Sequence, residues 1–246
     1  MARFVLVHGS FHGNWCWSRL SLRLEALGHE VVAPNLPASG DDTSPPEEAD
    51  LPHYVARVGA AIEATPGKTV LVGHSMGGIV CAQASERWAA RLAATVYING
   101  LLLRSGETLV SFLDAHAHLG VEDLVLKNMQ VSADGQTATF PREAAGAIFY
   151  NSCTPEDAAF AAGRLTPQRM KVYGDLLELT DAGFGSVRRF YVEGLRDQAV
   201  SIAYQRAMTE RTPCEEVITL DGDHSPFLSA TAELAGILHR LAGKVT

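Results

Sequence analysis

The chain has 246 residues, of which 47% are hydrophobic and 20% charged, and its formal net charge is -8 at pH 7. This composition is typical of a globular protein with a sizeable core, and the length suits one large α/β domain or a domain with an inserted lid. Acidic and basic residues are interspersed and no Lys/Arg block occurs, so we expect neither a nucleic acid nor a membrane as a partner.

Targeting and metal-binding patterns are also missing from the sequence. The apolar run at residues 4–7 is too short for a signal peptide, and no apolar span reaches 18 residues. The pair His116 and His118 lacks the carboxylates or cysteines that would complete a metal site, so we predict no metal. The scattered cysteines indicate reduced thiols and a cytoplasmic protein; they are Cys16, Cys81, Cys153 and Cys214.

The first hundred residues alternate between strand-like and helix-like segments. Apolar runs predict buried strands at 3–9, 29–36, 68–74 and 93–100. Apolar residues at helical spacing predict helices at 14–27, 53–65 and 76–92. Alternation of this kind predicts an α/β fold with a mostly parallel, doubly wound sheet.

The pattern changes after residue 100. Residues 101–185 contain helical stretches, such as 106–120 and 154–165, without strands between them. Alternation then resumes with further strands and helices, which we predict at 187–194, 199–210, 215–222 and 227–242. We therefore predict an α/β core made of residues 1–100 and 186–246, with a helical cap inserted at 101–185.

The stretch LVGHSMGGIV places Ser75 between Gly73 and Gly77 in the pattern G-x-S-x-G. A predicted strand precedes it and a predicted helix follows it, which is the context of a nucleophile elbow. Side chains at the flanking glycines would collide with a neighbouring strand or helix, and Gly78 allows the helix to pack closely. We therefore interpret Ser75 as a catalytic nucleophile rather than an incidental serine in a turn.

A serine hydroxyl needs a base that takes its proton, and in this arrangement the base is a histidine after the last strand. His224, in LDGDHSPF, has that position. His8, His12 and His74 lie near the same edge of the sheet but too early in the chain. We therefore expect His224 to be the general base.

The acid that orients the base should lie between the nucleophile and the base, after a strand. Asp197 follows a predicted strand by a short turn. Asp221 and Asp223 lie on the loop of His224 itself, too close along the chain to reach the far side of its ring. We therefore expect Asp197 to be the third catalytic residue; the alternative is a solvated turn aspartate beside Arg196.

The oxyanion of the tetrahedral intermediate needs backbone N–H donors. The residue after the nucleophile, Met76, should supply one, and the loop HGSFHG after the first strand should supply the other. Ser10 is the best candidate in that loop and Phe11 the second. We also expect Ser10 and Phe11 to contact the substrate.

Several stretches together carry a resemblance to a known family: FVLVHGSFHGNWCWSRL, LEALGHEVVAPNLPASG, LVGHSMGG, YNSCTPEDAAFA, FGSVRRFYV and DGDHSPFLS. They resemble the plant methylesterase and hydroxynitrile lyase branch of the α/β-hydrolases, which includes salicylate-binding esterases and bacterial esterase relatives. GHSMGG is common to many α/β-hydrolases, whereas HGSFHGNWCW is more specific to this branch. The resemblance implies a Ser75–His224–Asp197 triad and a helical cap over an apolar pocket, and it is compatible with a homodimer.

The branch contains both esterases and lyases, so departures from its patterns matter. Its lyases place a lysine directly after the catalytic histidine and a threonine where Gly9 stands. This chain has Ser225 and Gly9 at those positions, which favours a serine carboxylesterase that hydrolyses small esters through an acyl-enzyme without any cofactor. A hydroxynitrile lyase and a weakly active receptor for a small ligand are the alternatives.

Overall fold

The computed structural model describes residues 1–64 and 66–245. The strands of its main sheet are β1 (Arg3–Val7), β2 (Glu30–Val32), β3 (Thr69–His74), β4 (Leu92–Ile98), β8 (Arg189–Gly194) and β9 (Glu216–Leu220). They have the order β2-β1-β3-β4-β8-β9, and all neighbouring strands pair in parallel, so the predicted parallel sheet is confirmed. Strand β2 ends before the predicted residue 36, because Pro34 has no N–H to donate to a neighbouring strand.

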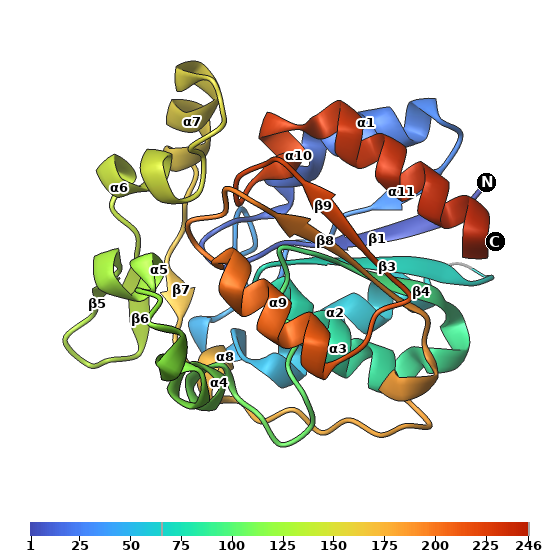
Figure 1. Cartoon of the computed structure of the whole chain (residues 1–246), viewed down its shortest axis with the longest axis horizontal. Coiled ribbons are helices and arrows are strands. Elements are labelled where there is room, and N and C mark those ends of the chain that lie inside the picture. Colours follow the sequence, from blue (N-terminus) through green and yellow to red (C-terminus); the bar gives the residue numbers. More distant parts are fainter. Residues whose placement is uncertain (65, 246) are drawn as a thin grey trace.

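Helices cover both faces of this sheet (Figure 1). On one face lie α1 (Ser18–Ala26), α10 (Pro226–Ser229) and α11 (Thr231–Val245), and on the other lie α2 (Leu51–Glu63), α3 (Gly77–Trp88) and α9 (Ile202–Arg211). Successive side chains of β1 point to opposite faces of the sheet, so each face has its own hydrophobic core. Phe4 packs in the core beneath α1, α10 and α11, and Val5 packs in the core beneath α2, α3 and α9. The helix predicted at 53–65 is α2; Thr65 itself lies outside the described residues.

The helices and short strands between β4 and β8 lie to the left of the main sheet in Figure 1, where the cap is predicted. Its helices are α4 (Leu109–Ala115), α5 (Leu124–Asn128), α6 (Arg142–Ile148), α7 (Pro155–Ala162) and α8 (Lys171–Gly174). The sequence predicted mostly helical stretches here, and the structure adds three short strands that form an antiparallel sheet: β5 (Gln130–Val131), β6 (Thr137–Thr139) and β7 (Gln168–Arg169). These strands are too short to show an alternating pattern in the sequence. The division of the chain at residues 101 and 185 stays a prediction.

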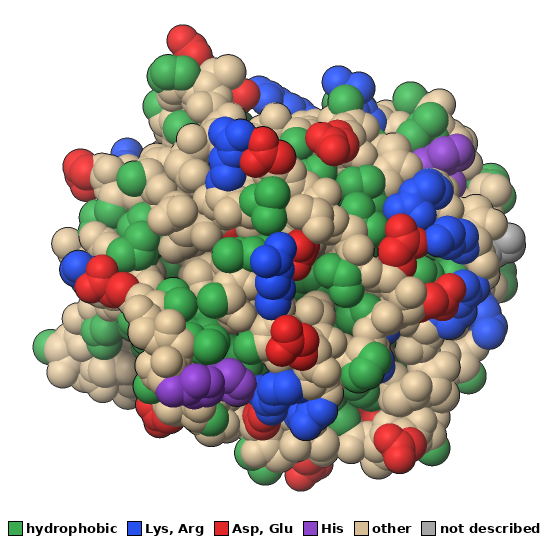
Figure 2. Space-filling model, in the orientation of Figure 1, with side chains coloured by type: hydrophobic (Ala, Val, Ile, Leu, Met, Phe, Trp, Pro, Cys, Tyr) green, Lys and Arg blue, Asp and Glu red, His purple; other side chains and the backbone are tan. Residues whose placement is uncertain are grey.

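Acidic and basic side chains are mixed over the face shown in Figure 2. Many form ion pairs across the surface, such as Arg188 with Glu215 and Arg240 with Glu216. All four cysteines are free. Within residues 1–64 and 66–245, no helix combines the length and the apolar character that a membrane span requires.

Candidate active site

The turn between β3 and α3 presents Ser75 in a strained conformation. Its φ of 52° lies in the left-handed region, which residues other than glycine rarely adopt and which occurs often at functional sites. Its carbonyl oxygen accepts hydrogen bonds from the N–H groups of Gly78 and Leu101, both at 2.9 Å. The surrounding chain therefore holds the turn in place.

The glycines around Ser75 lie where a side chain would collide with backbone. A Cβ on Gly73 would lie 2.7 Å from the carbonyl oxygen of Gly77, and one on Gly77 would lie 2.6 Å from the carbonyl oxygen of Val7 at the end of β1. A Cβ on Gly78 would lie 2.7 Å from the backbone of Leu101. The reasons inferred for Gly73 and Gly77 agree with this packing, and Gly78 makes room for the chain that follows β4.

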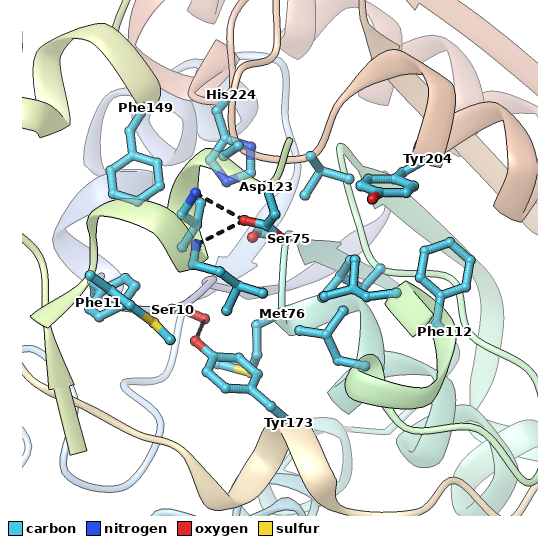
Figure 3. Close-up of a pocket in the computed structure, with 18 residues that line it drawn as sticks. Ser10, Phe11, Ser75, Met76, Phe112, Asp123, Phe149, Tyr173, Tyr204 and His224 are labelled. Atoms are coloured by element: carbon cyan, nitrogen blue, oxygen red, sulfur yellow. Dashed lines mark hydrogen bonds between the residues drawn. The ribbon is translucent and has the colours of Figure 1, made fainter. Parts of the chain in front are cut away.

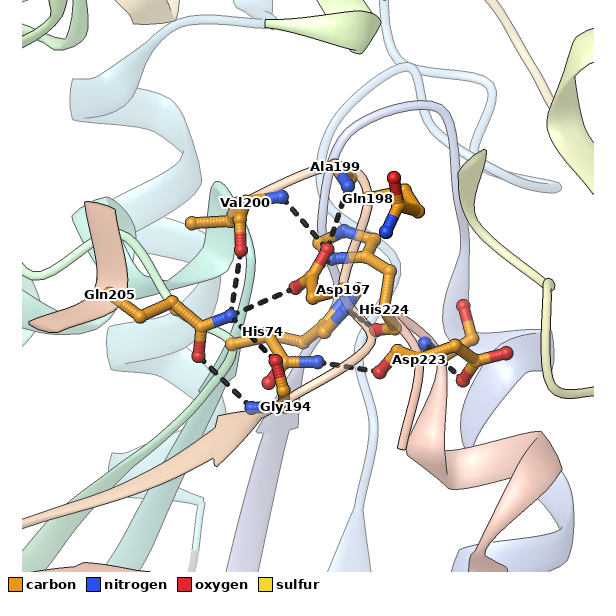
Figure 4. A network of polar contacts seen from close by, with 12 residues as sticks. His74, Gly194, Asp197, Gln198, Ala199, Val200, Gln205, Asp223 and His224 are labelled. Carbon is orange, nitrogen blue, oxygen red and sulfur yellow. Dashed lines mark hydrogen bonds and ion pairs between the residues drawn. The ribbon is translucent and has the colours of Figure 1, made fainter. Parts of the chain in front are cut away.

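His224 and Asp197 form a buried hydrogen-bonded pair (Figure 4). The distance from Nδ1 of His224 to Oδ2 of Asp197 is 2.8 Å, and the residues are 2% and 4% exposed. When Nδ1–H donates this bond, the neutral ring leaves Nε2 free to accept a proton. Among the described residues, neither this Nε2 nor Oγ of Ser75 forms a hydrogen bond; catalytic hydrogen bonds are often long before a substrate binds.

A set of donors fixes the Asp197 carboxylate after β8 (Figure 4). Its Oδ1 accepts from the N–H groups of Ala199 and Val200 at 2.7 and 2.8 Å, and its Oδ2 also accepts from the Gln205 side chain at 3.3 Å. Gln205 donates in addition to the carbonyl oxygen of Val200 and accepts from the N–H of Gly194. The carboxylate is thus held as the acceptor for the histidine ring.

The other aspartates near His224 have different partners. Asp221 pairs with Arg196 at the surface. Asp223 accepts hydrogen bonds from Ser229 at 2.7 Å and from the N–H of the cap residue Ser152 at 2.8 Å. Among these carboxylates only Asp197 bonds the histidine ring, and it is buried rather than solvated in a turn.

Three further histidines, at positions 8, 12 and 74, are buried around this pair. Burial lowers the pKa of His8 to about 4 and that of His12 to about 3, and it holds the pKa of His74 well below its ordinary value. These neutral rings support the backbone: His74 Nε2 lies 2.7 Å from the carbonyl oxygen of His224, and His12 Nδ1 lies 2.7 Å from that of Ser10. They add no positive charge to the site near pH 7.

The expected oxyanion residues, Ser10 and Met76, line one pocket together with Phe11, Ser75 and His224 (Figure 3). In the described part of the chain, the N–H groups of Ser10 and Met76 donate no hydrogen bond. These two donors are therefore available to an oxyanion.

The rest of the pocket wall comes mostly from the cap and is largely apolar. A phenol from α8 closes one side, where the hydroxyl of Tyr173 donates a 2.6 Å hydrogen bond to Oγ of Ser10. The Ser10 hydroxyl is therefore already paired with the cap. An apolar pocket with a few polar groups suits a small organic ligand; its apolar cap residues include Phe112, Leu113, Leu126, Met129 and Phe149.

Gly9 and Ser225 stand at the two positions where a lyase of this branch is expected to have threonine and lysine. A Cβ on Gly9 would lie 2.7 Å from Cβ of Ser75, so a threonine there would collide with the candidate nucleophile. Ser225 is fully buried, its hydroxyl has no partner among the described residues, and it does not line the pocket.

His116 and His118 bond the main chain of the cap through their Nδ1 atoms. Within residues 1–64 and 66–245, no group of three or more His, Cys, Asp or Glu side chains has the arrangement of a metal site.

Sequence reasoning missed three side chains of this region: Asp123, Tyr173 and Gln205. Asp123 and Tyr173 belong to the cap, whose register against the core has no local signal. Gln205 lies one turn inside a helix, where a glutamine is usually a solvated residue.

Comparisons with known proteins show the family of the chain. The sequence profile of the alpha/beta hydrolase family matches residues 4–237. Norfluorocurarine synthase 2 from Strychnos sp is 33% identical, over 98% of this chain and 96% of that protein. Salicylic acid-binding protein 2 from Nicotiana tabacum is 30% identical, over 98% and 97%.

Other relatives are longer or more distant. Putative methylesterase 13, chloroplastic, from Arabidopsis thaliana is 31% identical, and the chain spans only 55% of that protein's length. Among solved structures, polyneuridine aldehyde esterase superposes with a TM-score of 0.88 at 22% identity, covering 98% of this chain and 99% of that one. A pyrethroid hydrolase from Sphingobium faniae superposes with a TM-score of 0.86 at 24% identity, covering 98% and 97%. At these identities the structural likeness shows the fold alone.

Proposed function

The chain belongs to the α/β-hydrolase family, in the branch that holds the plant methylesterases, and from this premise we propose that it is a serine carboxylesterase acting on small carboxylic esters. The observation that carries the proposal is the buried Asp197–His224 pair, whose open ring nitrogen belongs to the pocket that Ser75 lines. This is the residue set that acyl transfer requires.

In the proposed acylation step, Oγ of Ser75 attacks the ester carbonyl while Nε2 of His224 takes the hydroxyl proton. Asp197 stabilises the resulting imidazolium through its 2.8 Å hydrogen bond. The N–H groups of Ser10 and Met76 stabilise the oxyanion. The intermediate then expels the alcohol, which receives the proton from His224, and an acyl-serine remains.

Deacylation follows the same route with water as the nucleophile. His224 takes a proton from the water as it attacks the acyl carbonyl, and returns it to Oγ of Ser75 when the carboxylic acid leaves. The proposed cycle needs only protein groups and water.

The proposal is tested with p-nitrophenyl acetate. Ser75→Ala should lower kcat by about 10³-fold or more, because the nucleophile is lost. Ser225→Ala is the matched control; its hydroxyl is buried, unpaired within the described residues and outside the pocket, so kcat should change little. Unchanged hydrolysis by Ser75→Ala would refute the mechanism.

The two alternatives predict other results in the same preparation. A hydroxynitrile lyase would release cyanide from mandelonitrile. The lyases of this branch are expected to have a threonine at position 9, and this chain has no room for one there, because a Cβ on Gly9 would collide with Ser75. A receptor would bind a small ligand tightly with negligible turnover of every ester offered.

A further inference from the structure

One carboxylate stands in the otherwise largely apolar pocket wall. Asp123 comes from the cap and lines the same pocket as Ser75 and His224 (Figure 3). The lining residues include no lysine and no arginine. Asp123 forms no ion pair with any described residue.

Only one oxygen of Asp123 has a partner in the protein. Oδ1 accepts from the N–H groups of Val125 and Leu126, both at 2.9 Å, and so caps α5. Oδ2 accepts no hydrogen bond from the described residues. Two buried aspartates of the core differ in this respect, since both oxygens of Asp197 and both of Asp223 accept hydrogen bonds.

Burial penalises the charge on this carboxylate. It raises the pKa of Asp123, and the two backbone N–H bonds oppose this effect only in part. Burial raises the pKa of Tyr204 and of Tyr173, the phenols of the pocket wall, and the negative charge of Asp123 raises both pKa values further. Asp123 is half-buried, and a carboxylate that is partly withdrawn from water is best stabilised by a cation, which no described side chain supplies.

We propose that Asp123 is a specificity-determining residue that selects esters bearing a protonated amine, with Oδ2 as its acceptor. The inference rests on the esterase function proposed above and names its substrate class. A charged partner suits the site better than a hydroxyl, because charge-assisted hydrogen bonds are the stronger ones and a low dielectric strengthens ion pairing. The aromatic wall, including Tyr204, also favours a cation.

The competing explanation is that Asp123 only caps α5. A cap needs one oxygen, and asparagine or serine serves as well as aspartate. Asp123→Asn therefore keeps the cap and removes the charge, which separates the two roles. Asp50→Asn is the matched control, because Asp50 caps α2 through a 3.1 Å bond to the N–H of His53 and does not line the pocket.

Two pairs of isosteric esters test the proposal at pH 7, with acid release followed by pH-stat. On the acyl side, methyl 4-(dimethylamino)butanoate is compared with methyl 5-methylhexanoate. On the alcohol side, 2-(dimethylamino)ethyl acetate is compared with 3-methylbutyl acetate. Each pair replaces a protonated nitrogen with a CH group, so the ratio of the two kcat/KM values measures preference for the charge.

In the pair whose amine reaches Asp123, the ratio should favour the cation and should fall about tenfold or more in Asp123→Asn, which corresponds to about 1.4 kcal/mol. Asp50→Asn should leave the ratio unchanged. A ratio that is the same in Asp123→Asn and the unchanged chain, for both pairs, would overturn the proposal.

Binding to Ser75→Ala keeps this test separate from that of the esterase function. Calorimetric titration of Ser75→Ala with the same esters should show tighter binding of the aminated ester, and the preference should be lost in Ser75→Ala/Asp123→Asn. If Ser75→Ala still hydrolyses the esters, the proposed mechanism fails. If it does not, and neither aminated ester binds better than its neutral partner, the role of Asp123 fails.

Discussion

The buried histidines should make the protein less stable at pH 5 than at pH 7. His8 and His12 bind protons near pH 6.5 in the unfolded chain but only near pH 4 and pH 3 in the fold. Below pH 6.5 the unfolded chain therefore binds more protons, and the free energy of unfolding falls as the pH falls. From pH 6.5 to pH 5 each histidine contributes about 1.5 × 1.36, or about 2 kcal/mol. The two together give about 4 kcal/mol, and burial lowers the pKa of His74 and His29 in the same direction.

Urea unfolding at pH 7 and pH 5, at constant ionic strength, measures this difference. His12→Gln should be less stable at pH 7, because it disturbs a buried hydrogen-bonded ring, but it should lose about 2 kcal/mol less than the unchanged chain between the two pH values. His118→Gln, at an exposed position of the cap, is the control and should keep the full difference. Equal or greater stability at pH 5 would show that these rings are not held neutral in the fold.

Three substitutions test the site itself. Asp197→Asn should lower kcat by about 10³–10⁴-fold because the histidine loses its charged partner, while Asp221→Asn, at the surface, should not; equal losses in both would contradict the assignment. Gly9→Thr should lower kcat/KM by at least about tenfold and lower Tm, since its Cβ would lie 2.7 Å from that of Ser75. An unchanged Tm and rate would mean that the turn at Ser75 can shift at little cost in stability. Tyr173→Phe removes a 2.6 Å hydrogen bond to the oxyanion loop and should lower kcat/KM by about three- to tenfold, whereas no change would assign the bond to structure alone.

The core of the fold could be predicted because its signals are local. An apolar run with a glycine or histidine at its end was enough to place β1 and β3, and both pair in the expected parallel sheet. The elbow at Ser75 follows from glycines whose neighbours leave no room for a side chain. The order of Ser75, Asp197 and His224 along the chain then indicated a site whose members the fold brings together.

The cap could not be predicted to the same depth. Its strands, such as β5 and β7, have two residues each, which is too few for a period to appear. Asp123 has the sequence context of an ordinary helix cap, and its place in the pocket wall depends on how the cap lies on the core. The pairing of Tyr173 with Ser10 joins residues far apart in sequence, and no local pattern encodes it.

The central claim is that Ser75 is the nucleophile, and covalent labelling tests it most directly. A fluorophosphonate should react with Oγ of Ser75 and release fluoride, because this hydroxyl shares its pocket with the open nitrogen of His224. Peptide mapping by mass spectrometry should find the phosphonyl group on Ser75, esterase activity should fall in step with labelling, and His224→Ala should label far more slowly. An adduct on another residue, or full activity after complete labelling of Ser75, would contradict the account.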